Sequence, residues 1–284
     1  MIDFRPIFLI LGFLLTTLAV MMMVPAAVDI FADNPDWQVF AAAGGVTLFV
    51  GVSLSLTSRT GGAKLSVRQA FILTTLSWVV LTVFAALPFA FSQLELSFTD
   101  AFFEAMSGIT TTGATVIVNL DTAPPGLLLW RSLLQWLGGI GIIVMALAVL
   151  PLLRVGGMQL FHMESSDQSD KALPRTAQIA AAIVVIYLAL TVIWSGALWL
   201  AGLSGFDAIA HAMTTIATGG FSTHDASLSY YDSAVVEAIT TVGMILGSLP
   251  FLLYLLTLQG RVGVLFKDSQ VQWFFKVLVV VILF

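Results

Sequence analysis

Two stretches of this chain join a short helical sequence to a run of threonine and glycine, and they are copies of one another. Residues 97–115 read SFTDAFFEAMSGITTTGAT, and residues 204–222 read SGFDAIAHAMTTIATGGFS. Aligned without gaps, they are identical at Ser97/Ser204, Asp100/Asp207, Ala101/Ala208, Ala105/Ala212, Met106/Met213, Ile109/Ile216, Thr111/Thr218 and Gly113/Gly220. This self-similarity indicates an internal duplication.

The chemistry that these stretches offer is a set of backbone oxygens that no helix can use. Each copy opens with Ser-x-x-Asp, a capping signature, and continues for about eleven residues of helix-forming sequence, roughly 16 Å or half a bilayer. The runs TTTG at 110–113 and ATGG at 217–220 then break the helix, and glycine permits the positive φ that turns carbonyls toward one axis. Such oxygens can replace the hydration shell of a small cation, and the negative end of the helix dipole points the same way. We interpret both stretches as cation pore loops.

The composition places these loops in a membrane. Of 284 residues, 59% are hydrophobic and only 10% are charged, with a mean hydropathy of +1.02. A soluble domain has about a quarter of its residues charged. Irregular backbone at membrane depth is tolerated where protein buries it or where it lines a water-filled cavity. No basic patch is large enough to indicate nucleic acid, and the lack of cysteine excludes disulfides and thiol chemistry.

Apolar runs of membrane-spanning length flank the pore loops. We expect spans at 6–27, 37–58, 69–91, 127–153, 176–202 and 232–258, followed by a segment, 270–284, of only roughly 22 Å as a helix. The first run is longer than the core of a signal peptide, which predicts a retained helix. LTVF at 81–84 returns as LTVI at 190–193, so the duplication extends into the spans.

The predicted fold is an all-α polytopic membrane protein with two leading transmembrane helices, two parallel repeats of span, pore loop and span, and the start of a third. We predict a two-helix membrane domain at 1–68, the first repeat at 69–153, a cytoplasmic loop at 154–175, the second repeat at 176–259 and a truncated third at 260–284. Parallel copies suit rotation about an axis along the membrane normal, as a pore requires.

Charged residues divide between the two sides of the membrane. If the spans alternate, the basic residues fall on one side, which is cytoplasmic by the positive-inside rule and holds the N-terminus. Acidic residues fall on the other side, from which both pore loops enter, and an acidic vestibule concentrates cations. The basic set is Arg5, Arg59, Lys64, Arg68, Arg154, Lys171, Arg175, Arg261 and Lys267, with Lys276 just inside the last segment. The acidic set is Asp29, Asp33, Asp36, Glu95, Asp100, Asp121, Asp207, Asp225 and Asp232.

Three ionisable residues lie at membrane depth, where such residues are functional candidates. Glu104 and His211 occupy equivalent positions on the two half-helices; a metal or proton-relay role is one interpretation, and bracing of the loop by hydrogen bonds is the favoured one. Arg131 is either a positive barrier in an ion path or, as we favour, a salt-bridge partner or a snorkelling side chain.

Three glycines in the fourth span suggest close contact between helices. We expect Gly138, Gly139 and Gly141 to allow close packing, with a gating hinge as the alternative.

Three motifs resemble the TrkH/KtrB/HKT superfamily of potassium transporters, most closely its TrkH type: FFEAMSGITTTGAT at 102–115, LLQWLGGIGIIV at 133–144 and FDAIAHAMTTIATGGFSTHDASL at 206–228. The resemblance runs to residue 284 and implies the front half of such a protein, with two of four repeats. It implies that K⁺ is coordinated by backbone oxygens of Thr110, Thr111, Thr112, Gly113, Ala217, Thr218, Gly219 and Gly220. Gly113 and Gly220 would be the key glycines.

The same resemblance implies a potassium uptake protein that is not an enzyme and uses no cofactor, with K⁺ as the transported ligand. It implies a homodimer in the bacterial inner membrane that binds a cytosolic, nucleotide-binding TrkA-like ring. The loop 154–175, with Glu164, Asp167 and Asp170, is either a solvated face or the docking site of that ring.

Other classes of function are open at this stage. A secondary cation transporter with broken helices also explains irregular backbone, although it usually has inverted repeats. A non-conducting, truncated partner subunit is a further alternative. An intramembrane enzyme using Asp207, His211 and Glu104 is disfavoured, because no catalytic spacing such as HExxH is present.

Overall fold

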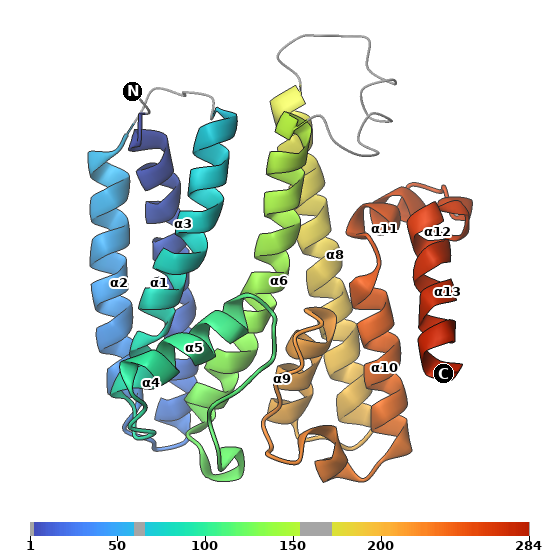
Figure 1. Ribbon diagram of the computed structural model, residues 1–284. Coiled ribbons are helices and arrows are strands. Elements are labelled where there is room, and N and C mark those ends of the chain that lie inside the picture. Colours follow the sequence, from blue (N-terminus) through green and yellow to red (C-terminus); the bar gives the residue numbers. More distant parts are fainter. Residues whose placement is uncertain (1–2, 60–65, 154–171, 284) are drawn as a thin grey trace.

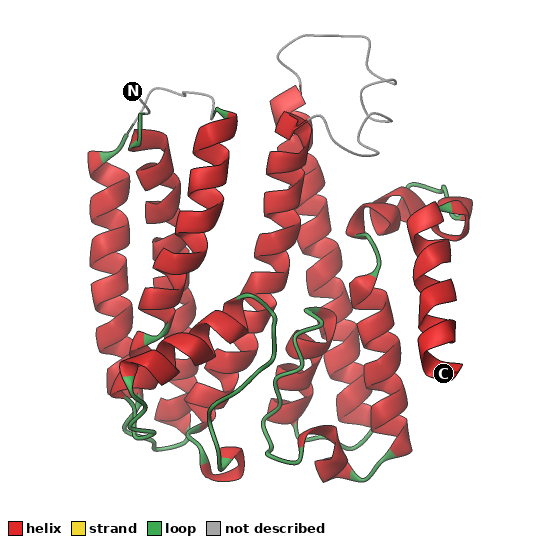
Figure 2. Ribbon diagram, viewed as in Figure 1, coloured by secondary structure: helices red, strands yellow, loops and turns green. Residues whose placement is uncertain are grey.

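The computed structural model describes residues 3–59, 66–153 and 172–283, and the regular structure within them is helical (Figures 1 and 2). Four helical segments are long and apolar enough to cross a membrane: Arg5–Phe31, Trp37–Thr57, Val67–Phe91 and Gln178–Leu200. These confirm a multi-pass membrane protein. Six charged residues named above lie outside the described residues: Lys64, Arg154, Glu164, Asp167, Asp170 and Lys171.

The two leading helices pack closely because small residues face each other. They are α1 (Arg5–Phe31) and α2 (Trp37–Thr57). A methyl group added at Gly51 of α2 would come within 2.8 Å of the backbone nitrogen of Thr16 in α1. Because glycine has no side chain, the two helix backbones can approach closely and gain van der Waals contacts with each other.

Each repeat contains a half-helix between two longer helices. The first comprises α3 (Val67–Ala85), α4 (Leu87–Phe91), the half-helix α5 (Phe98–Ile109), the short 3₁₀ helix η1 (Leu120–Thr122) and α6 (Pro125–Leu153). The second comprises α8 (Ala172–Leu200), the half-helix α9 (Gly205–Ile216), η2 (Ser227–Tyr231) and α10 (Ala234–Ser248). Both half-helices have 12 residues and begin at the same end of the molecule; the chain returns to that end after each (Figure 1).

An indole hydrogen bond joins the two long helices of each repeat, with donor and acceptor exchanged. In the first repeat, Trp130 of α6 donates from Nε1 to the carbonyl oxygen of Ala85 at the end of α3, at 3.0 Å. In the second, Trp194 of α8 donates to the carbonyl oxygen of Ile239 in α10, at 2.8 Å. At an offset of 109, Trp130 corresponds to Ile239 and Ala85 corresponds to Trp194. The contact between the two helices is therefore kept in both repeats, but the tryptophan donor lies on the opposite helix.

The expected span at 232–258 is broken in the structure. It consists of α10 and α11 (Phe251–Leu258), which meet at an angle of 89°. Pro250 causes the break, because proline has no N–H for the helical ladder and forces the preceding Leu249 into an extended conformation with ψ 148°. Two further helices follow, α12 (Gly263–Lys267) and α13 (Ser269–Leu283), and Val271 of α13 packs with Leu249 and Leu253.

The two ends of the molecule differ in the charges they carry. Arg5 and Arg68 lie in the first turns of α1 and α3, at the end of the molecule opposite the starts of α5 and α9 (Figure 1). Asp100 and Asp207 lie in the first turns of those half-helices. This arrangement agrees with the separation of charges expected from the sequence.

Candidate functional site

Both half-helices begin with the same cap. Ser97 Oγ accepts from the backbone N–H of Asp100 at 3.2 Å and donates to its carboxylate at 2.7 Å. Ser204 and Asp207 repeat the arrangement at 3.0 and 2.8 Å. These bonds satisfy N–H groups that the first helical turn leaves without partners, which fixes where each half-helix starts.

Both half-helices also end in the same way, with a threonine in the left-handed region. Thr111 has φ 56° and Thr218 has φ 53°. The N–H of Thr111 donates to Gly108 and that of Thr112 donates to Ser107, both at 2.9 Å. This is the Schellman pattern of helix ends, in which glycine usually takes the left-handed position.

The first loop, residues 110–118, and the second loop, residues 217–225, then run back toward the starts of the half-helices. Gly113 and Gly220 have φ 80° and 84°, which confirms the expected positive φ at both. Within the described residues, no carbonyl oxygen of 110–113 or 217–220 accepts a hydrogen bond. The described residues therefore supply no hydrogen-bond donor to the four carbonyl groups of either loop.

The two loops lie against one another. A methyl group added at Gly113 would overlap the carbonyl oxygen of Gly219 and lie 3.7 Å from the Cα of Gly220. The structure therefore brings Gly113 and Gly220 close together. Of the eight predicted residues, Ala217 and Gly219 are buried, Thr110, Thr111 and Gly113 are half-buried, and Thr112, Thr218 and Gly220 are exposed.

Glu104 and His211 brace their loops through equivalent contacts. Glu104 is fully buried and accepts from Thr115 Oγ1 at 2.9 and 3.0 Å and from the N–H of Val116 at 3.0 Å. His211 Nε2 lies 3.0 Å from Ser222 Oγ. Thr115 and Ser222 are themselves equivalent residues of the duplication. The hydrogen bonds confirm the bracing interpretation of both residues.

Arg131 is buried and paired. Its Nε lies 2.8 Å from Glu104 Oε1, and its Nη1 donates to the carbonyl oxygen of Ser222 at 2.6 Å. Its guanidinium also lies 4.2 Å from the centre of the Phe221 ring. Because only 1% of Arg131 is exposed, the salt-bridge interpretation is confirmed and a positive barrier facing solvent is not supported.

The geometry agrees with comparisons with known proteins. The family model TrkH, described as a cation transport protein, matches residues 36–284. This chain belongs to the TrkH family. The Trk system potassium uptake protein TrkI of Halomonas elongata is 44% identical over 279 residues, which cover 98% of this chain and 57% of that protein. The Trk system potassium uptake protein TrkH of Escherichia coli K12 is 41% identical, over 96% of this chain and 58% of that protein.

A solved structure shares the arrangement of helices. The crystal structure of the potassium transporter TrkH from Vibrio parahaemolyticus superposes with a TM-score of 0.89 at 38% identity, over 98% of this chain and 57% of that one. This TrkH-family chain therefore spans somewhat more than half the length of these relatives.

Gln135, one turn after Arg131 on α6, was not predicted from the sequence. Its Oε1 accepts from the N–H of Phe221 at 3.0 Å, and its amide fills the space beside the Cα of Gly219. A polar residue four positions after an arginine, inside an apolar span, was the available signal.

Two of the three glycines of α6 pack as expected. A methyl group added at Gly138 would meet Ile109, and one added at Gly139 would meet Ala217, whereas Gly141 faces open space.

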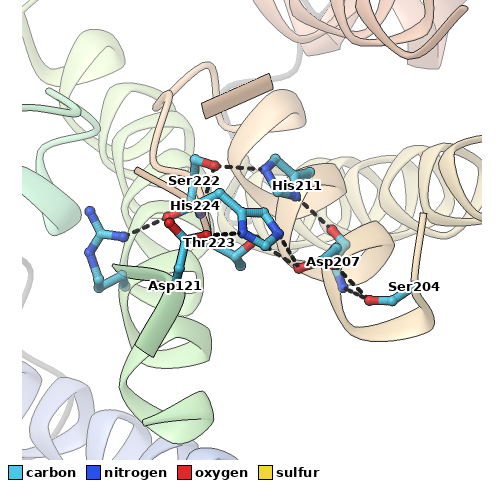
Figure 3. A network of polar contacts seen from close by, with 8 residues as sticks. Asp121, Ser204, Asp207, His211, Ser222, Thr223 and His224 are labelled. Carbon is cyan, nitrogen blue, oxygen red and sulfur yellow. Dashed lines mark hydrogen bonds and ion pairs between the residues drawn. The ribbon is translucent and has the colours of Figure 1, made fainter. Parts of the chain in front are cut away.

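A second missed cluster joins the end of the second loop to η1 of the first repeat (Figure 3). His224 stacks on Tyr230 at 3.5 Å between ring centres and places Nδ1 2.6 Å from Asp121 Oδ1. Its Nε2 is 3.7 Å from Asp207 Oδ1, which also accepts from Thr223 at 2.7 Å. The hydrogen bond from His224 lowers the pKa of Asp121. The contact joins residues 103 positions apart, so it could not be predicted from local sequence patterns.

Proposed function

We propose that this chain forms part of a pathway for potassium uptake across the bacterial inner membrane, as the channel-like subunit of a Trk-type system with a cytoplasmic N-terminus. The observation that carries the proposal is the pair of adjacent loops, each with a left-handed threonine, a left-handed glycine and four carbonyl oxygens that no described residue uses. Relatives at 44% and 41% identity are named potassium uptake proteins.

The mechanism needs no bond chemistry. K⁺ loses its hydration shell and is held by backbone oxygens of Thr110, Thr111, Thr112 and Gly113 in the first loop and of Ala217, Thr218, Gly219 and Gly220 in the second. Two loops supply part of a ring. A methyl group added at Gly113 would meet the second loop, whereas one added at Gly220 would meet nothing within 4 Å. We propose that further loops of a longer protein lie in this open space and complete the ring.

The assembly is also part of the proposal. We infer the repeat boundaries given above, a homodimer, and a cytosolic nucleotide-binding ring that docks on residues 154–175. Replacing Glu164, Asp167 and Asp170 by alanine tests the docking site. Ring binding should weaken, and unchanged binding would remove this loop from the interface.

Potassium transport is tested with a chimera in which residues 1–284 replace the aligned part of Halomonas TrkI. Expressed in cells that lack potassium uptake, the chimera should restore growth at low K⁺, and residues 1–284 alone provide the comparison. A chimera that reaches the membrane but transports no K⁺ contradicts the proposal.

The loops are tested in the same chimera by flux measurements. Gly113→Ser and Gly220→Ser should lower the ratio of K⁺ to Na⁺ transport, because serine is strained at positive φ and shifts the neighbouring carbonyls. Gly45→Ser is the matched control, since Gly45 lies in α2 with nothing within 4 Å of an added Cβ. A ratio that is unchanged in both loop variants counts against the filter assignment.

A further inference from the structure

Arg131 lies on α6 of the first repeat, and its guanidinium contacts the half-helix of that repeat and the loop of the second. Nε pairs with Glu104 of the first repeat, and Nη1 donates to the carbonyl oxygen of Ser222 in the second. We propose that Arg131 is a positioning residue that holds the two loops at a fixed separation and thereby sets the cation selectivity of the pathway. This inference rests on the proposed function.

On the side of the first loop, the link runs through Glu104. Both carboxylate oxygens accept from Thr115, and Oε2 also accepts from the N–H of Val116. These residues follow Gly113 by two and three positions. Since Glu104 is fully buried, water cannot replace a lost partner, and any movement of the loop away from Arg131 leaves a hydrogen bond unmade.

On the side of the second loop, two residues of α6 bind the backbone of the consecutive residues Phe221 and Ser222. Arg131 donates to the carbonyl oxygen of Ser222, and Gln135 accepts from the N–H of Phe221 at 3.0 Å. The Phe221 ring lies under the guanidinium. Ser222 follows Gly220 by two positions. Each loop is therefore hydrogen-bonded two or three positions after its glycine, the first to Glu104 and the second to Arg131.

The second repeat has no corresponding ion pair among the described residues. Gly138 and Gly247 both pack against the carbonyl oxygen of the last half-helix residue, Ile109 and Ile216 respectively, and they are 109 positions apart. The same offset takes Arg131 to Thr240, whose hydroxyl is buried without a partner in the described part of the chain. The link is therefore a single contact between two particular loops, and one residue tests it.

Lysine separates geometry from charge at this position. The guanidinium reaches Glu104 and Ser222 with two different nitrogens, whereas an ammonium group is a single point that cannot span both. If the charge alone mattered, Arg131→Lys would behave like the wild-type protein. If positioning matters, Arg131→Lys and Arg131→Gln should behave alike.

Two measurements test the proposal. In the chimera, Arg131→Lys and Arg131→Gln should each lower the K⁺ to Na⁺ transport ratio about tenfold, the factor that corresponds to one lost hydrogen bond to a charged group. In residues 1–284, which contain no cysteine, spin labels at Val118→Cys, in the first loop, and Ala226→Cys, directly after the second, report the separation of the loops. Both positions are exposed, and the distance distribution should broaden in the Arg131 variants. Arg68→Lys and Arg68→Gln, at an exposed arginine far from the loops, are the controls and should change neither measurement.

The proposal requires both effects in both variants. A wild-type ratio or an equally narrow distance distribution in Arg131→Lys overturns it. If the single variants do not fold, Glu104→Gln/Arg131→Met removes both buried charges together, a change that buried pairs often tolerate, and the same two outcomes decide. If the chimera carries no K⁺ even with Arg131 in place, the proposed function fails, while the label distances still decide whether Arg131 positions the loops.

Discussion

Thr111 and Thr218 hold a backbone conformation that β-branched residues rarely adopt. Each costs about 1 to 3 kcal/mol relative to an unstrained residue, and such residues persist where the surroundings fix them and where strain serves a function. The positive φ of Gly113 and Gly220 could be predicted because glycine is the residue suited to it. The positive φ of the threonines could not, because their residue type argues against it; only their retention in both copies was a sign.

At the residue scale, Thr111→Gly should separate stability from selectivity. Glycine relieves the strain but adds freedom to the unfolded chain, so we expect the free energy of unfolding to stay within about 1 kcal/mol of wild type. The loosened loop should lower the K⁺ to Na⁺ ratio in flux assays on the chimera. Thr111→Val is the matched control, since it keeps the β-branched shape and should keep the ratio. A lower ratio in the valine variant alone would show that the hydroxyl, not the backbone, matters.

Asp121 gives a prediction about pH. The hydrogen bond from His224 lowers the pKa of this carboxyl below its ordinary value of about 4. A depressed pKa means that the contact stabilises the fold above the ordinary pKa and that this contribution is lost as the pH falls through the folded-state pKa. Thermal unfolding should therefore show a wild-type protein more stable than Asp121→Asn near neutral pH, with the difference vanishing in acid. An equal difference at every pH would mean that ionisation of Asp121 contributes nothing.

At the scale of elements, the half-helices were the most predictable part. Their Ser-x-x-Asp caps, apolar runs and Thr/Gly stops are all local signals, and α5 and α9 begin directly after Ser97 and Ser204 as those signals predict. The break before α11 was missed, because the apolar run continues through Pro250 and hides the change in direction. Which helix meets which was also beyond the sequence: a small Gly108 faces Leu134 in the first repeat, whereas Thr215 faces a small Gly243 in the second.

The contact between each half-helix and the long helix after it predicts the effect of glycine substitutions in α6. A methyl group at Gly138 would overlap the carbonyl oxygen of Ile109, so Gly138→Ala should destabilise the protein by about 1 to 3 kcal/mol in denaturant unfolding. Gly141 faces open space, and Gly141→Ala should be neutral or stabilising by up to about 1 kcal/mol, because alanine is the better helix former. If the two variants are equally stable, Gly138 is not a packing residue.

At the scale of the whole molecule, the duplication in the sequence predicted two parallel repeats, because each unit returns the chain to the same side. The sequence could not show that Arg131 and His224 connect the two repeats, since these contacts join residues 91 and 103 positions apart and depend on how the repeats dock. Local patterns therefore predicted the parts, and tertiary packing decided how the two loops meet.

The surroundings of Gly113 and Gly220 differ, and this difference predicts how alanine substitutions at the two positions affect stability with and without the proposed further loops. An added methyl group overlaps Gly219 at Gly113 but meets nothing within 4 Å at Gly220, although both positions have positive φ. In residues 1–284 alone, Gly113→Ala should therefore lower the unfolding temperature more than Gly220→Ala, which carries only the cost of the strained backbone. In the chimera, the proposed ring places further loops beside Gly220, so the two variants should be destabilised alike. A difference that persists in the chimera would mean that the space beside Gly220 stays open, and the ring of carbonyl oxygens would then need another arrangement.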